Sequence, residues 1–127
     1  AVAQSMRLLG RQFVLGQTIE EGMRNARERE RQGYTYSYDM LGEAARTEAD
    51  ALRYLKSYSD AIASIAKTAK GDVRSNPGIS VKLSALHPKY TFLHADLAVA
   101  DLLPVVRDLA TAARDANIHF TIDLYIV

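Results

Sequence analysis

Apolar residues recur along the 127-residue chain with two different spacings. Apolar and polar residues alternate one by one in three stretches, at 34–39, 79–84 and 118–123. A period of two predicts β-strands. Elsewhere apolar residues recur every three or four positions, which predicts amphipathic helices. The expected order is helix, helix, strand, helix, strand, helix, strand.

The first two predicted helices precede the first strand. Residues 6–15 favour a short amphipathic helix. A capping box follows, in which the Thr18 oxygen accepts the amide of Glu21 and the glutamate side chain accepts the amide of Thr18. The second helix should therefore begin at Ile19 and stop near Gly33.

The longest predicted helix opens on a second capping signal, formed by Thr47 and Asp50. Its apolar face keeps a spacing of three or four residues until a stop near Gly71. The residues on this face are Leu52, Leu55, Tyr58, Ile62, Ile65 and Ala69.

The last helical region contains a proline. Pro104 has no amide hydrogen to donate and its ring crowds the preceding turn, so two helical pieces are expected, at 95–103 and 105–116. Asn117 should end the second piece.

The strand at 79–84 carries the most unusual chemistry. Three apolar residues alternate with Ser80, Lys82 and Ser84. A lysine among small hydroxyls predicts a face that meets an anionic group. An edge strand with a solvated lysine explains the same pattern equally well.

Crossovers of about 40 residues are what parallel strands require. Three parallel strands with helices predict an α/β fold, either the amino-terminal portion of a (β/α)8 TIM-type barrel or part of a doubly wound sheet. Chemistry in both folds is at the carboxyl ends of the strands. Asp39, Lys82 and Asp123 are at or near those ends.

These three residues form a candidate binding cluster. An ammonium between two carboxylates stays protonated and is a poor metal site, because it repels a cation. The cluster suits a zwitterion, with Lys82 on its carboxylate and an aspartate on its amine. The three histidines, His87, His94 and His119, have no recognised ligand spacing.

Charge and composition narrow the function classes further. A net charge of +1 gives no global case for nucleic acid or an anionic membrane, and the absence of cysteine excludes thiolate chemistry. Residues 24–31 alternate arginine with glutamate, which favours a solvated helix face over a nucleic-acid surface. The absence of a signal segment or a long apolar run favours a cytoplasmic protein, and the apolar end, 120–127, suggests a piece of something longer.

The tyrosines at 34, 36 and 38 alternate with small hydroxyl residues. Such a stripe is more often core than a platform for a cofactor.

Two long motifs resemble the proline dehydrogenase domain of bacterial proline utilization A flavoenzymes. They are Tyr-Ser-Tyr-Asp-Met-Leu-Gly-Glu-Ala-Ala at 36–45 and Gly-Ile-Ser-Val-Lys-Leu-Ser-Ala-Leu-His-Pro-Lys-Tyr at 78–90. Ile122-Asp123 resembles the third strand motif, and residues 6–16 resemble the segment that leads into the domain. By this resemblance, residues 1–33 are a helical lead-in and 34–127 are the first three β/α units of the barrel.

The resemblance implies an FAD-dependent enzyme that oxidises L-proline to Δ1-pyrroline-5-carboxylate in proline catabolism. Hydride would pass to the flavin and electrons to membrane quinone, with peripheral membrane contact in the full-length enzyme. Lys82 resembles the lysine beside the substrate carboxylate and flavin, and Asp39 and Asp123 resemble the acids of the proline pocket. Glu43 resembles an acid that pairs with a later arginine, and Met40 and Leu41 fall on the pocket wall.

The third strand departs from the family pattern, since Leu124 to Val127 replace the usual Ala-Glu-Glu. The family also takes most flavin contacts and an arginine pair from later strands. The isolated chain is therefore expected to be inactive. The alternative is a noncatalytic α/β scaffold that self-associates through an exposed strand.

Overall fold

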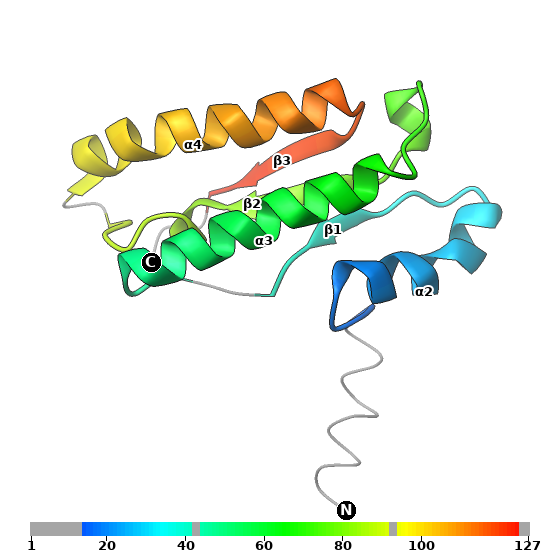
Figure 1. Cartoon of the computed structure of the whole chain (residues 1–127), viewed down its shortest axis with the longest axis horizontal. Coiled ribbons are helices and arrows are strands. Elements are labelled where there is room, and N and C mark those ends of the chain that lie inside the picture. Colours follow the sequence, from blue (N-terminus) through cyan, green and yellow to red (C-terminus); the bar gives the residue numbers. More distant parts are fainter. Residues whose placement is uncertain (1–13, 42–43, 92–93, 125–127) are drawn as a thin grey trace, which may run out of the picture. The chain divides into compact units, whose positions relative to one another are not determined.

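A computed structural model describes residues 14–41, 44–91 and 94–124 of the chain (Figure 1). The described residues fall into two compact units, one up to Tyr36 and one from Ser37 onward. None of the helices in these ranges is both long and apolar enough to cross a lipid bilayer.

The first unit contains the helix α2, Ile19–Arg31. It begins at the predicted residue, where the Thr18 hydroxyl accepts the amide of Glu21 at 3.2 Å. The predicted return bond is wrong in its partner, because the Glu21 carboxylate accepts the amide of Gln17 instead. Gly33 has a φ of 94°, a left-handed conformation that suits the predicted helix stop. Most of the helix predicted over 6–15 lies outside the described residues.

The second unit is built on a parallel three-stranded sheet with the order β1-β2-β3 (Figure 1). Its strands are β1 (Ser37–Asp39), β2 (Gly78–Lys82) and β3 (His119–Asp123). The predicted α/β class is confirmed. The edge-strand interpretation of the lysine-bearing strand is wrong, because β2 is hydrogen-bonded on both sides.

The strand β1 is shorter than the predicted strand over 34–39. Only Tyr38 of the tyrosine stripe belongs to the core, with 7% of its surface exposed. Tyr34 is 58% exposed and its ring lies under the Arg29 guanidinium at 5.9 Å. The core interpretation of the stripe therefore holds for one of the three tyrosines.

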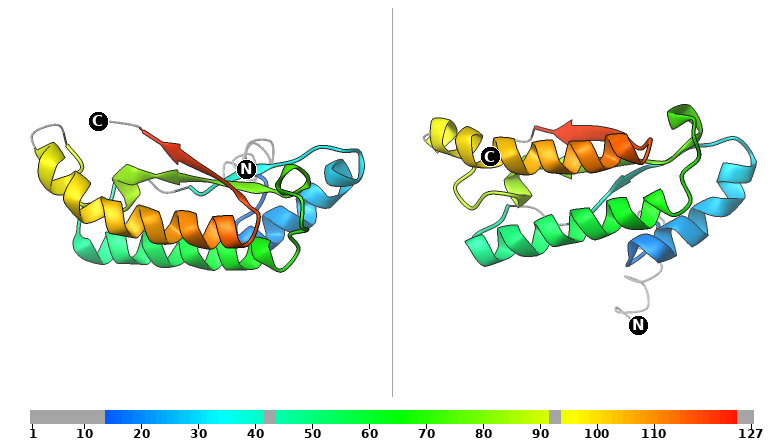
Figure 2. Two further views of the ribbon diagram at one scale, coloured as in Figure 1. Left: turned by 90° about the horizontal axis from the view of Figure 1, so that it is seen from above. Right: turned by 45° about the horizontal axis from the view of Figure 1, so that its top comes forward.

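Two helices cover one face of the sheet, as Figure 2 shows. They are α3 (Glu48–Ala66) and α4 (Ala95–Asp115), which contact each other, and α4 also contacts β3. Their small and branched residues bury Ile79 and Val81, both fully inaccessible to solvent. The buried residues of α3 are Ala51, Tyr58, Ala61, Ile62 and Ile65.

The predicted inner face of α3 is wrong at its amino-terminal end. Leu52 is 66% exposed, and Ala51 occupies the buried position beside it. The alanine permits a closer approach to the neighbouring elements than a leucine would. The helix also ends at Ala66, before the predicted stop at Gly71.

The helix α4 is continuous through Pro104, so the prediction of two pieces is wrong. A proline removes one backbone hydrogen bond and crowds the turn before it. Pro104 is exposed, and water can therefore satisfy the carbonyl that loses its partner. The left view of Figure 2 shows that the helix is bent towards its amino-terminal end.

The segment after β2 turns away from the sheet earlier than the period of two predicts. Leu83–Ala85 form the short 3-10 helix η2, so Ser84 is buried and does not continue the polar strand face. Its carbonyl accepts the amide of Ala45 at 2.8 Å, which ties the segment after β1 to the end of β2.

Asn76 fastens the opposite end of the sheet. It is 2% exposed and follows the 3-10 helix η1, Val73–Ser75. Its amide group donates to the carbonyls of Lys70 and Asn117, at 2.6 and 2.9 Å, and its oxygen accepts the amide of Lys70 at 2.6 Å. One side chain thus joins the segment after α3 to the turn before β3.

We expect Asn76→Ala to lower the free energy of unfolding by about 2–4 kcal/mol, because three buried hydrogen bonds are lost. Asn76→Asp keeps the oxygen that accepts from Lys70 but places a buried charge against two carbonyls, so it should be at least as damaging. Urea denaturation measures both. Ser75→Ala, an exposed neighbour, is the control, and equal effects at 75 and 76 would contradict the role of Asn76.

The capping box of α3 predicts a pH dependence. Thr47 and Asp50 exchange both hydrogen bonds, at 3.1 Å each. The bond to Thr47, supported by Arg53 and the amide of Arg46, lowers the pKa of Asp50 below its usual 3.8. A lowered pKa in the folded state stabilises the protein above pH 3.8, and this contribution disappears as the pH falls through the folded-state pKa. We therefore expect the melting temperature of Asp50→Asn to fall less than that of the unsubstituted chain as the pH is lowered from about 5 to about 2. Thermal unfolding across this pH range measures the difference.

Candidate functional site

The sheet face opposite the helices is polar. Registered neighbours in parallel strands point to the same side of the sheet. The register pairs Asp39 with Ser80, and pairs Lys82 with Asp123. All four side chains therefore share one face, together with Thr121, and this face does not carry the buried residues Ile79 and Val81.

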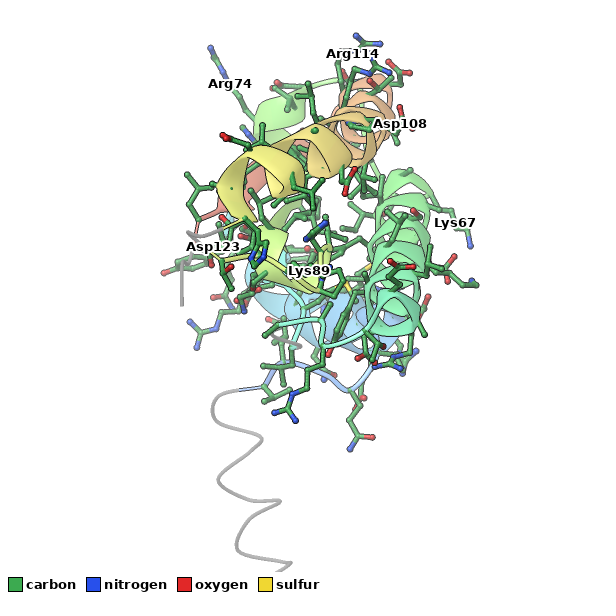
Figure 3. All side chains as sticks on the ribbon, turned by 90° about the vertical axis from the view of Figure 1, so that its left-hand side faces the viewer. Lys67, Arg74, Lys89, Asp108, Arg114 and Asp123 are labelled. Carbon is green, nitrogen blue, oxygen red and sulfur yellow. The ribbon has the colours of Figure 1, made fainter. Side chains whose placement is uncertain are left out.

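Each residue of the predicted cluster is the last residue of its strand. Asp39 ends β1, Lys82 ends β2 and Asp123 ends β3. Figure 3 views the sheet from this carboxyl end, with Asp123 labelled. The predicted position of the three residues at one edge is thus confirmed.

Lys82 forms an ion pair with Asp39 across the first two strands. Its ammonium lies 3.2 Å from each carboxylate oxygen of Asp39. The lysine side chain is only 13% exposed, whereas the aspartate side chain is 51% exposed. The lysine was expected to face an anionic group, and the Asp39 carboxylate of the same chain is such a group.

Tyr58 of α3 supports the same strand end from the helix side. Its hydroxyl accepts the main-chain amide of Lys82 at 3.1 Å, and the residue is 1% exposed. Burial raises the pKa of Tyr58; the amide and charge of Lys82 oppose this rise, and the Asp39 and Asp123 carboxylates add to it. The hydroxyl therefore keeps its proton at neutral pH and is close enough to sense all three charges of the cluster.

The other predicted site residues differ in placement. Met40, directly after β1, is half-buried, and Leu41 is 77% exposed. Glu43 lies outside the described residues. Asp123 is half-buried.

The histidines have other partners. His87 is 9% exposed, its Nδ1 accepts the amide of Lys89 at 3.1 Å, and its Nε2 faces the Asp101 carboxylate at 3.2 Å. Because Nδ1 accepts a hydrogen bond, the proton of the neutral ring is on Nε2 and donates to Asp101. His94 contacts Thr91. In the described ranges, no group of three or more histidine or acidic residues could hold a metal ion.

This arrangement suits a small zwitterion. A mostly buried ammonium binds a carboxylate well, since little water competes with the ligand. An exposed carboxylate nearby can receive a protonated amine. The sequence predicted Tyr58 only as a core residue. A buried tyrosine hydroxyl needs a hydrogen-bond partner, and this requirement could have indicated a polar contact for Tyr58.

Residues 22–124 match the proline dehydrogenase family. The bifunctional protein PutA of Klebsiella aerogenes is 49% identical over 123 residues, which are 96% of this chain and 9% of that protein. Proline dehydrogenase 1 of Bacillus subtilis is 30% identical over 98% of this chain and 37% of its own length. The chain thus spans less than half the length of either relative.

A solved structure from the same family has a similar backbone fold. A variant of proline utilization A from Bradyrhizobium japonicum superposes with a TM-score of 0.74 at 45% identity. The superposition covers 97% of this chain and 12% of the other.

The ion pair between Lys82 and Asp39 can be measured by a double-mutant cycle. We expect a coupling of about 0.5–1 kcal/mol between Asp39→Asn and Lys82→Met, because the half-exposed carboxylate weakens the attraction. Urea denaturation of the two single variants and the double variant gives the value. A coupling free energy that stays the same when about 1 M salt is added would contradict an ionic origin, because salt screens charge–charge attraction.

Proposed function

The chain belongs to the proline dehydrogenase family, and we propose that it forms the first three strand and helix units of a (β/α)8 barrel that oxidises L-proline. The product is Δ1-pyrroline-5-carboxylate. The reaction removes a hydride equivalent from a ring carbon of proline and a proton from its nitrogen, so that a carbon–nitrogen double bond forms.

The observation that carries this proposal is the Lys82 ammonium on the polar face of the sheet, 13% exposed and 3.2 Å from Asp39. Proline has one carboxylate and one ring amine, both attached to the same carbon. Lys82 binds the carboxylate, and the half-exposed Asp39 receives the ring amine. Each charge of the pair is therefore opposite in sign to the substrate group that it meets.

Asp123 completes the polar edge in this proposal. As the registered neighbour of Lys82, it adds a second carboxylate on the same face. In this proposal it contributes, with Lys82, to the catalytic and cofactor contacts. Met40, Leu41 and Glu43 lie along the segment after β1 and line the substrate pocket in this assignment.

FAD is the cofactor that we propose, and it supplies the acceptor for the hydride when bound. The residues present fit one edge of such a group, because the carboxyl end of the sheet offers a mostly buried cation and a nearby acid beside the small residues Ser80 and Thr121. Lys82 and Asp123 would hold that edge. Quinone is the proposed final electron acceptor, and peripheral contact with its membrane is part of the proposal.

Most of the cofactor contacts belong, by this proposal, to parts of the enzyme other than these residues. We infer that the 127 residues expressed alone retain little flavin and do not turn over proline. A second candidate role rests on β3, which has one registered neighbour among the described strands, and on the exposed residues Ile122 within the strand and Leu124 directly after it. In that role the strand pairs with another copy, and the chain is a noncatalytic scaffold.

The test uses the complete proline dehydrogenase that contains this chain, with bound flavin monitored by absorbance. We expect the flavin band to bleach when proline is added without oxygen. Lys82→Met should raise KM for proline and reduce kcat/KM by about 100-fold or more, since a buried charged contact is worth about 3 kcal/mol. The fold, followed by circular dichroism, should persist.

Lys67→Met is the matched control, because this exposed lysine lies beyond the end of α3. It should leave turnover unchanged. Unaltered kinetics in Lys82→Met would reject the assigned role of Lys82. A flavin that does not respond to proline in the unsubstituted enzyme would reject the proposed function, and a concentration-dependent dimer of the 127-residue chain would favour the scaffold.

A further inference from the structure

Tyr58 makes a contact that its place in the hydrophobic face of α3 does not require. Its ring lies in the core with Ile62 and Ile65, and a phenylalanine would fill the same volume. Within the described part of the chain, the hydroxyl adds a hydrogen bond from the main-chain amide of Lys82. That bond ends at the residue whose side chain carries the positive charge of the site.

The strand end at Lys82 needs such support. The last registered pair of β1 and β2 is Asp39 with Ser80, so Lys82 extends two residues beyond the pairing with β1. Immediately after it, the chain leaves the strand and enters η2. A residue at this transition is held by fewer ladder bonds than the middle of the strand, and its side chain would otherwise move with the turn.

We propose that Tyr58 is a positioning residue, whose hydroxyl fixes the Lys82 backbone so that the ammonium meets the substrate carboxylate in one geometry. This inference rests on the proposed function for its substrate, but the contact itself does not. The buried hydroxyl stays neutral, so it accepts the amide without adding a charge beside the lysine. The pairing with β3, the Tyr58 hydroxyl and the ion pair with Asp39 then all hold Lys82.

The decisive variant is Tyr58→Phe in the complete flavin-loaded enzyme, with Tyr54→Phe as the control. Tyr54 is one turn earlier on α3, half-buried, and its ring faces the Arg53 guanidinium at 5.4 Å. We expect Tyr58→Phe to raise KM for proline about three- to tenfold, the factor of one lost hydrogen bond, with a smaller change in kcat. Tyr54→Phe should leave both unchanged.

Two further readouts separate positioning from stability alone. In a Lys82→Met background, Tyr58→Phe should change KM by less than about twofold, because no ammonium remains to be positioned. Equilibrium binding of cyclopentanecarboxylate, which has the ring and the carboxylate but no oxidisable amine, should weaken by the same factor as KM rises. A lowered melting temperature with unchanged KM, or equal effects with and without Lys82, would overturn the proposal.

Hydrogen exchange at the Lys82 amide makes the outcome independent of turnover. Tyr58→Phe should accelerate exchange at this amide, and Tyr54→Phe should not. If the unsubstituted enzyme fails to oxidise proline, the proposed function is rejected. Independently of turnover, an unchanged exchange rate at the Lys82 amide in Tyr58→Phe would reject the anchoring by Tyr58. Faster exchange with unchanged binding of the carboxylate probe would also reject positioning.

Discussion

The register of β2 between its two neighbours is the constraint on which the rest of the second unit depends. Parallel pairing with β1 and β3 aligns Asp39 with Ser80 and Lys82 with Asp123. A shift of one residue would turn every side chain of the strand to the opposite face. Ile79 and Val81 would then meet solvent, and the lysine would enter the layer of α3 and α4. The burial of two aliphatic side chains therefore determines which way the ammonium points.

The same reasoning explains which features the sequence predicts well. Alternating apolar residues located β2 and β3, and the reciprocal hydrogen bonds of Thr47 and Asp50 located the start of α3. The alternation placed Asp39, Lys82 and Asp123 at or near strand ends, and the parallel topology brought those ends to one edge. In each case a short stretch of chain contains the physical cause, either a capping side chain or a period of two.

Features that depend on distant partners were not predictable in this way. The periodicity of α3 assigned Leu52 to the core, but packing against the neighbouring layer selects Ala51. Pro104 stays inside α4 because the proline faces solvent, which local propensity does not reveal. Ser84 was assigned to the polar strand face, yet its carbonyl binds Ala45, nearly 40 residues earlier in the chain. Tyr58 belongs to this class, since only the fold brings its hydroxyl to Lys82.

Stability and chemistry occupy opposite ends of the sheet. At the amino ends of the strands, Asn76 is 2% exposed and its three hydrogen bonds are with main-chain atoms, so it joins segments without offering a free charge. At the carboxyl ends, the charged groups of Asp39 and Lys82 are partly open to solvent and pair with each other. An ion pair of this kind contributes little to folding because the carboxylate is half-exposed. It can therefore exchange its partner for a substrate at small cost to the fold, provided that the backbone beneath it is fixed by other contacts. Tyr58 and the pairing with β3 supply those contacts.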